Sequence, residues 1–315
     1  MKLARQRGVA VITALLLTTL AITIVASLFW EQQVQVRSME NQRLHLQTKW
    51  ILHGALDWAS LVLKQDGYDN QGATTLNSVW NTPLAETRLD QYIERERVQN
   101  EVFDATLSGH IVDATSRLNL RNLLNQGKPD PLYVKIYGRL LQNLHLDAAL
   151  AAHTASAFAA SAALPQGGAP ASVATLTFER LDDLLAIDGY TPDIIAKLHD
   201  FAMVLPIATR VNVNTAPAEV IAALAENFSV AQANALVSAR KTRPFFRSTD
   251  FLNAFNGQTK PDVNTYDVNS NYFLVLSRVR LDRAALDAEA LIHRSVASIS
   301  GDPSSGTSVV WIRQN

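Results

Sequence analysis

The pattern of hydrophobic and polar positions predicts a long helix at the start of the chain. Residues 9–29 carry no charge, and as a helix they would span about 32 Å at roughly 1.5 Å per residue. This length matches the hydrocarbon core of a bilayer. Lys2, Arg5 and Arg7 precede the run, and Glu31 is the first charge after it. The positive-inside rule therefore places the N-terminus in the cytoplasm and the rest of the chain across the membrane.

The same helix is predicted to continue beyond the apolar run. No proline occurs before Pro83, and no glycine lies between Gly8 and Gly54, so nothing local breaks a helix over residues 9–64. Gly67 and Gly72 are expected to end it. Apolar residues of its outer half recur at mostly helical spacing, which predicts a face that packs on a globular head. These residues are Met39, Leu46, Leu52, Leu56, Ala59 and Leu63.

Strand-like alternation further along predicts an antiparallel sheet. Residues 84–96 indicate a short helix, and the next stretch indicates a two-stranded hairpin that turns at Ser108 and Gly109. Near the C-terminus, residues 269–281, 284–296 and 307–315 are rich in β-branched and aromatic residues. Short polar turns between them favour an antiparallel arrangement.

The middle of the chain is predicted to be helical. Residues 146–165 are alanine-rich, and two helix–turn–helix repeats follow at 178–198 and 211–252. In the second repeat, Thr215 is expected to cap a helix with Pro217 in its first turn. Both repeats resemble helix-hairpin-helix modules.

These elements predict an α+β fold in which a long N-terminal helix packs on an antiparallel sheet and a large all-α domain is inserted. The predicted divisions are a leader (1–8), a membrane helix (9–29), the first part of the head (30–125), the inserted domain (126–260) and the C-terminal strands (261–315).

Composition and charge exclude several classes of function. The 315 residues include 28 basic and 29 acidic side chains, so no global positive field points to nucleic acid. The chain has no cysteine, which excludes a disulfide, a thiol nucleophile and a thiolate metal site. The seven histidines form no metal-ligand motif, and no phosphate loop, dinucleotide fingerprint or serine nucleophile motif occurs. We therefore expect a protein that is not an enzyme and requires no cofactor.

Three interpretations of the N-terminal segment remain open. A cleaved signal peptide would have a shorter apolar region and a small-x-small site. A plain membrane anchor is the second. In the third, Gly8 at the cytoplasmic edge resembles the end of a type IV prepilin leader, which a prepilin peptidase cuts after the glycine. Val9 would then be the first mature residue and the site of N-methylation. The fifth mature residue is Thr13, where most pilin-like proteins have glutamate.

The order of these features is similar to that of the K-type minor pseudopilins of bacterial type II secretion systems. The resemblance rests on the leader with Thr13, on "SRLNLRNLL" at 116–124, on "VNVNTAP" at 211–217 and on the terminal strands. It implies an inner-membrane precursor, processed by the prepilin peptidase, whose head is periplasmic. It also implies assembly with I-type and J-type minor pseudopilins at the tip of a filament of major pseudopilin. That filament drives folded proteins across the outer membrane.

Local motifs suggest two further ligands, calcium and DNA. Asp262, Asn264 and Asp267 lie in an oxygen-rich stretch that could hold calcium, although its spacing is not that of an EF-hand and a turn capped by Asx side chains explains the same residues. The alternative function is a single-pass membrane protein whose helix-hairpin-helix domain binds DNA. Asp188 and Glu226 put negative charge at the two hairpins, which speaks against nucleic acid as a partner. A local basic cluster is formed by Arg240, Lys241, Arg243 and Arg247.

Overall fold

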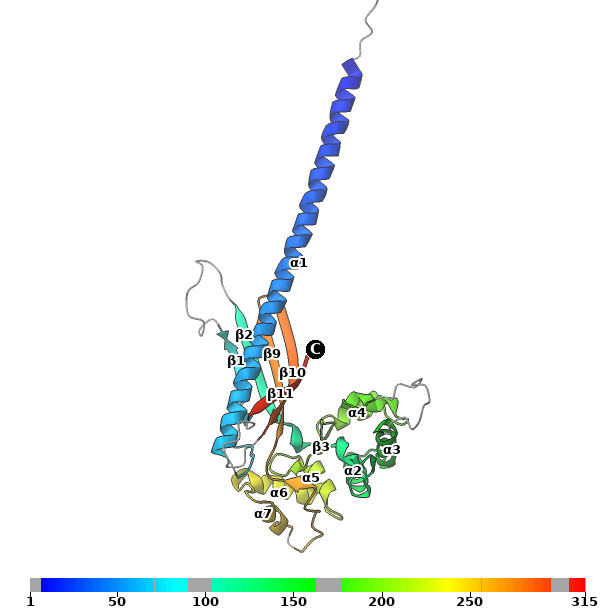
Figure 1. Cartoon of the computed structure of the whole chain (residues 1–315), viewed down its shortest axis with the longest axis vertical. Helices are drawn as coiled ribbons and strands as arrows, with labels where there is room; N and C mark the ends of the chain where they lie inside the picture. Colours follow the sequence, from blue (N-terminus) through cyan, green and yellow to red (C-terminus); the bar gives the residue numbers. More distant parts are fainter. Residues whose placement is uncertain are drawn as a thin grey trace, which may run out of the picture.

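A single helix dominates the computed structural model, which describes residues 7–70, 72–89, 104–162, 177–255, 257–295 and 306–314. Helix α1 runs for 63 residues, Arg7–Asp69, and its first half projects away from the rest of the molecule (Figure 1). The predicted uninterrupted helix is confirmed. It ends at Asp69, between Gly67 and Gly72, where these glycines were expected to end it.

The second half of α1 packs on a sheet. Leu52, Leu56, Ala59 and Leu63 follow one another at spacings of four, three and four residues, and each is at most 3% exposed. They meet Phe273 and other apolar side chains of the sheet in one core. This arrangement confirms the predicted packing face from Leu52 onward. The prediction is wrong for Met39 and Leu46, which are 61% and 57% exposed because the helix has not yet reached the sheet there.

The sheet has five strands in the order β1-β2-β9-β10-β11, and every pair in it is antiparallel. The C-terminal strands β9, β10 and β11 form a meander, as predicted, and α1 packs against all three of them. The strands are β1 Leu84–Arg88, β2 Ala105–Asp113, β9 Tyr272–Leu281, β10 Ala284–Arg294 and β11 Thr307–Gln314.

Two predictions for the first part of the head are wrong. Residues 84–88, expected to begin a short helix, form the edge strand β1, while most of the remainder of that stretch (90–96) lies outside the described residues. The hairpin at Ser108 and Gly109 is instead one continuous strand, β2. Gly109 permits a close approach of the paired strands β2 and β9, because a Cβ there would lie 2.5 Å from the Leu276 carbonyl oxygen of β9.

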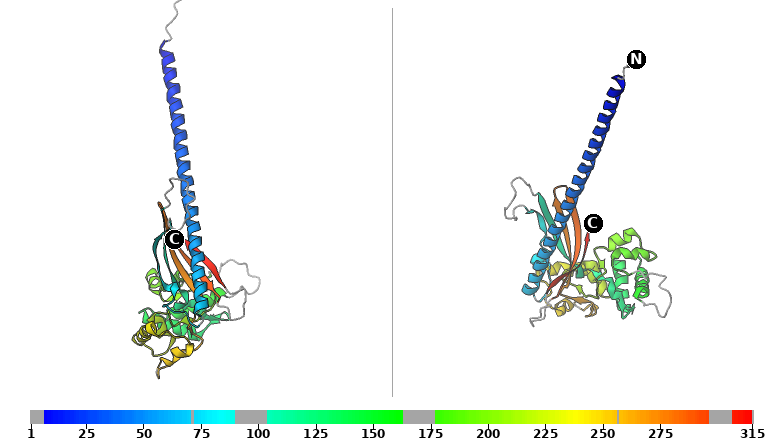
Figure 2. Two further views of the ribbon diagram at one scale, coloured as in Figure 1. Left: turned by 90° about the vertical axis from the view of Figure 1, so that its left-hand side faces the viewer. Right: turned by 45° about the horizontal axis from the view of Figure 1, so that its top comes forward.

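A helical domain is inserted between β2 and β9, and it lies at the end of the sheet opposite the free half of α1 (Figures 1 and 2). Its buried core includes residues from Leu118 to Val268, so packing extends somewhat beyond the predicted 126–260. Its helices are α2 Pro131–Asn143, α3 Leu150–Ala162, α4 Pro192–Leu198, α5 Ala218–Leu224, α6 Val230–Thr242 and α7 Ser248–Asn253.

Short strand pairs lie within the segment between β2 and β9. Two-residue parallel pairs link β3 Leu118–Asn119 to β6 Ala202–Met203, and β7 Val211–Asn212 to β8 Tyr266–Asp267. An antiparallel pair joins β4 Leu124–Asn125 and β5 Lys128–Pro129. The 3₁₀ helices are η1 Val79–Asn81, η3 Ala114–Ser116, η4 Leu120–Leu123 and η5 Leu181–Ala186.

The two helical repeats take different forms. In the first repeat, the first helix is the 3₁₀ helix η5 and the second helix is α4. Thr191 is the N-cap of α4, and its Oγ1 accepts a hydrogen bond from the Ile194 amide. In the second, α5 and α6 are both α-helices, but Thr215 does not cap α5. The N-cap is Pro217, and the Thr215 hydroxyl donates to Asp113 of the head instead. Similarity of these repeats to helix-hairpin-helix modules stays a prediction.

Candidate functional site

The exposed half of α1 is the first candidate surface. The large apolar side chains from Val11 to Trp30 are at least half exposed. This is the one helix, among the described residues, that is long and apolar enough to cross a membrane. Hydroxyls of Thr18, Thr19 and Thr23 donate to backbone carbonyls three residues earlier, at 2.8–3.0 Å, so they need no water as partner.

The sequence-predicted processing residues lie at the start of this helix. Gly8 and Val9 are in its first turn, and Thr13 follows about one turn later. Residues 1–6 of the predicted leader lie outside the described residues. Leader cleavage after Gly8 and methylation of Val9 therefore stay predictions.

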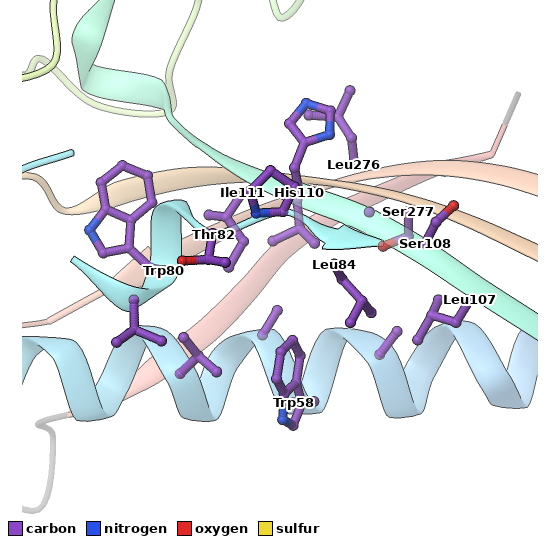
Figure 3. Close-up of a pocket in the computed structure, with 17 residues that line it drawn as sticks. Trp58, Trp80, Thr82, Leu84, Leu107, Ser108, His110, Ile111, Leu276 and Ser277 are labelled. Carbon is purple, nitrogen blue, oxygen red and sulfur yellow. The ribbon is translucent and has the colours of Figure 1, made fainter. Parts of the chain in front are cut away.

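An apolar groove lies between α1 and the β1–β2 half of the sheet. Its volume is about 220 Å³, and its walls come from α1, η1, β1, β2 and β9. Figure 3 shows Leu84, Leu107 and Ile111 between the strands and α1, with Trp58 on the helix. Trp58 is 54% exposed, whereas Trp80, which also lines the groove, is 1% exposed and packs edge-on against Phe273. The helix covers β9 to β11, so this apolar strip of sheet remains accessible.

A buried polar junction holds the inserted domain on the head. Asp113, at the end of β2, is 2% exposed. Its Oδ2 accepts hydrogen bonds from Asn212 Nδ2 at 3.1 Å, from Thr215 Oγ1 at 2.5 Å and from Ser270 Oγ at 2.5 Å. Its Oδ1 accepts from the amide and hydroxyl of Thr115, both at 2.8 Å. One carboxylate thus joins the head, the start of the second repeat and the segment leading into β9.

A buried ion pair lies beside this junction. Arg294, the last residue of β10, donates to Asp66 of α1 at 2.8 Å, and both side chains are 4% exposed. Arg294 also donates to Thr74 Oγ1 and to the Ser270 carbonyl. Pairing compensates the cost of burying these charges, and it fixes where α1 ends relative to the sheet.

Reasoning from sequence did not find this junction. The segment "VNVNTAP" was noted as a motif, and Asn212 and Thr215 do belong to it, but nothing local marks Asp113, Ser270 or Arg294. The distant partners of Asp113 lie 99–157 residues away, and Arg294 pairs with Asp66, 228 residues away.

The residues considered for calcium act as turn caps. Asp262 Oδ1 accepts from the Asn264 amide at 2.8 Å, and Asp267 Oδ1 accepts from the Val268 amide at 2.7 Å. Asp267 also faces Arg210 at 3.6 Å, a cation that competes with a metal ion. No group of three or more His, Asp or Glu residues within the described ranges is placed to hold a metal. Calcium binding here stays a prediction.

The predicted basic cluster is divided by the fold. Arg240 points inward, is 6% exposed and donates to the Val213 carbonyl. Burial lowers its pKa to about 10, so it remains charged at neutral pH. Lys241, Arg243 and Arg247 remain exposed. The four cations therefore do not form one surface.

A long helix whose apolar first half is free and whose second half packs on an antiparallel sheet is the architecture of pilin-like proteins. Two family models, both described as type II secretion system protein K, match residues 116–207 and 211–269. The chain is 30% identical over 300 residues to type II secretion system protein K of Pseudomonas aeruginosa, covering 88% of this chain and 85% of that one. The chain belongs to the type II secretion system protein K family.

Further similarities agree with this assignment. Type II secretion system protein K of Pectobacterium carotovorum is 26% identical over 325 residues, with 93% of this chain and 94% of that one covered. The fold is similar to a chain in the crystal structure of the GspK-GspI-GspJ complex of enterotoxigenic Escherichia coli. The TM-score is 0.65 at 17% identity, with 88% of this chain and 99% of that chain covered. Nothing in these comparisons supports the DNA-binding alternative.

Proposed function

We propose that this protein is a minor pseudopilin at the tip of the type II secretion pseudopilus, where it starts and caps the filament that exports folded proteins. It acts by assembly and carries out no chemistry of its own. The observation that carries the proposal is the helical domain of a protein K family member, placed on a pilin-like head at the end opposite the free half of α1. A subunit stacked beyond that domain would meet it, so a terminal position fits the shape.

The free half of α1 supports a role in two settings. In the precursor it would span the inner membrane with the N-terminus in the cytoplasm and the head in the periplasm. After cleavage behind Gly8 by the prepilin peptidase and methylation of Val9, the same apolar side chains would leave lipid and pack against helices of other subunits. Thr13 fits a first subunit, because a glutamate at this position would pair with the N-terminus of a preceding one.

The apolar groove supports lateral contact with partner pseudopilins. It lies beside α1, and Trp58 on its rim leaves more than half of its surface exposed. Large, half-exposed aromatic residues are typical anchors of protein interfaces. We assign this groove to an apolar helix face of the I-type or J-type minor pseudopilin, because the similar Escherichia coli structure is a complex of GspK with GspI and GspJ.

Isolation of the complex from cells tests the proposal. The full-length chain, tagged at its C-terminus, would be co-expressed with the I-type and J-type pseudopilins and the prepilin peptidase, then purified in detergent. Native mass spectrometry should give one complex with a copy of each subunit. Trp58→Ala should weaken it, whereas Leu185→Ala, an exposed apolar residue of the inserted domain, should not. Recovery of the chain alone under these conditions would contradict the proposal.

A further inference from the structure

The connection between α6 and α7 lies at the end of the molecule opposite the free half of α1 (Figures 1 and 2). Together with the end of α6 it carries exposed aromatic and basic residues. We call Lys241, Arg243, Phe246 and Arg247 the distal patch. Phe246 is 61% exposed, which is unusual for a phenylalanine, and all three cations are exposed. This surface is not used by the junction, by the groove or by the free half of α1.

The outward direction of Phe246 is imposed by its neighbour. The backbone amide of Phe245 donates to Asn214 Oδ1 at 2.9 Å, and Asn214 Nδ2 donates to the Phe245 carbonyl at 2.8 Å. The Phe245 ring is 8% exposed and packs edge-on against Phe251. With Phe245 fixed inward on both its backbone and its ring, the next side chain is held in solvent. Because the backbone is already fixed at Phe245, little backbone entropy is lost when the neighbouring Phe246 is covered.

Charge around Phe246 is mostly positive. Lys241, Arg243 and Arg247 make no salt bridge to any residue in the described ranges. Two acidic residues are nearby: Asp250 accepts from the Arg247 amide, and Asp69 accepts from Gln65. Both carboxylates keep their charge, so the three exposed cations exceed them by one, and this excess would attract acidic groups.

A hollow beside Phe246 offers room for an apolar side chain. It has a volume of about 540 Å³ and lies between the loop after α1 and the α6–α7 connection. Val79, 75% exposed, and Phe246 both line it, and Asn77 Nδ2 donates to the Lys241 carbonyl at 3.5 Å across its edge. Phe246 and Val79 thus give a largely polar hollow two exposed apolar contacts, and the cations of the distal patch lie close to Phe246 in the chain.

We propose that the distal patch docks an acidic segment of another protein, with carboxylates on Lys241, Arg243 and Arg247 and an apolar side chain against Phe246. The docking chemistry follows from the patch alone. Its accessibility in the assembled filament rests on the proposed tip position, because only a terminal subunit leaves this end uncovered.

Peptide binding to the full-length chain in detergent tests this proposal. The probes are two fluorescent synthetic peptides of one length, in which glutamates flank a central leucine or glutamines replace those glutamates. We expect the acidic peptide to bind about tenfold more tightly at low salt than the glutamine peptide, and to lose that advantage as salt is raised. Equal binding of the two peptides would overturn the proposal. Equal competition by duplex DNA would also overturn it, by showing a general polyanion surface.

Matched variants locate the binding. Arg243→Glu and Phe246→Ala should each weaken the acidic peptide several-fold, whereas Lys197→Glu and Ile207→Ala, exposed elsewhere on the inserted domain, should not. Circular dichroism would establish that all variants remain folded, and Arg243→Lys should bind as the natural chain does. If patch and control variants bind alike, the site is wrong. All of these variants should still assemble with the I-type and J-type subunits. The proposed function is tested separately, because it fails only if the unaltered chain does not assemble with those subunits.

Discussion

Replacing Asp113 by alanine removes the centre of the junction between head and inserted domain. The carboxylate is 2% exposed and accepts five hydrogen bonds, from Thr115, Asn212, Thr215 and Ser270. A hydrogen bond to a charged group contributes about 1.5–3 kcal/mol, and a buried donor left without a partner costs about 1–3 kcal/mol. The freed hydroxyls can find other acceptors and the burial of one charge is relieved, so we expect a net loss of about 3 kcal/mol rather than the full sum.

Urea unfolding of the full-length chain in detergent, followed by circular dichroism, measures this loss. Asp104→Ala is the matched control, because Asp104 immediately precedes the same strand but is exposed, in a long 3.7 Å ion pair with Arg88. The control should change the free energy of unfolding by less than about 0.5 kcal/mol. Hydrogen exchange should also show faster opening of the segment around Asn212 in Asp113→Ala. Equal free energies of unfolding for the two variants would refute the assignment of the junction.

Three single positions give further predictions. Gly109→Ala should cost about 1–3 kcal/mol in urea unfolding because its Cβ would meet a β9 carbonyl at 2.5 Å, whereas Gly54→Ala, with open space around it in α1, should be neutral or stabilising. Burial lowers the pKa of His293 from its ordinary value of 6.5, so the unfolded chain takes up a proton more readily and stability should fall as pH drops below about 6.5. Thermal melts at pH 5 and pH 7 should show this decrease, and His293→Gln should reduce it; an unchanged difference would contradict the attribution. Gly8→Leu should leave the intact mass at that of the full chain in cells with active prepilin peptidase, whereas the unaltered chain should lose residues 1–8; loss of the leader from the variant would contradict cleavage after Gly8.

Sequence patterns predicted those parts of the fold that depend on local periodicity. An apolar run without helix breakers is sufficient to predict α1, and β-branched segments with short turns are sufficient to predict β9 to β11. The hairpin prediction failed because Ser108-Gly109 has turn chemistry, while the structure uses Gly109 for a close approach to another strand. Both uses need a glycine, and only the position of β9 decides between them.

The parts of the candidate site that sequence did not predict depend on distant pairs. Asp113 is ordinary in its local context and acquires its role from Ser270, which lies 157 residues further on. In the same way, the adjacent Phe245 and Phe246 have equal hydrophobicity, and the hydrogen bonds of Asn214 determine which of the two is buried. The resemblance to the protein K family could be found from the sequence because the order of several weak motifs carries it. The contacts between those motifs could not.

The position of this protein in the filament is the central claim, and electron microscopy of gold-labelled pseudopili tests it most directly. A tag on the inserted domain, at the exposed residue Lys197, would be labelled on filaments grown in cells that produce all the pseudopilins. We expect label at one end of each filament, and shorter or absent filaments when the chain is removed. Label distributed along the filament shaft would contradict the tip position.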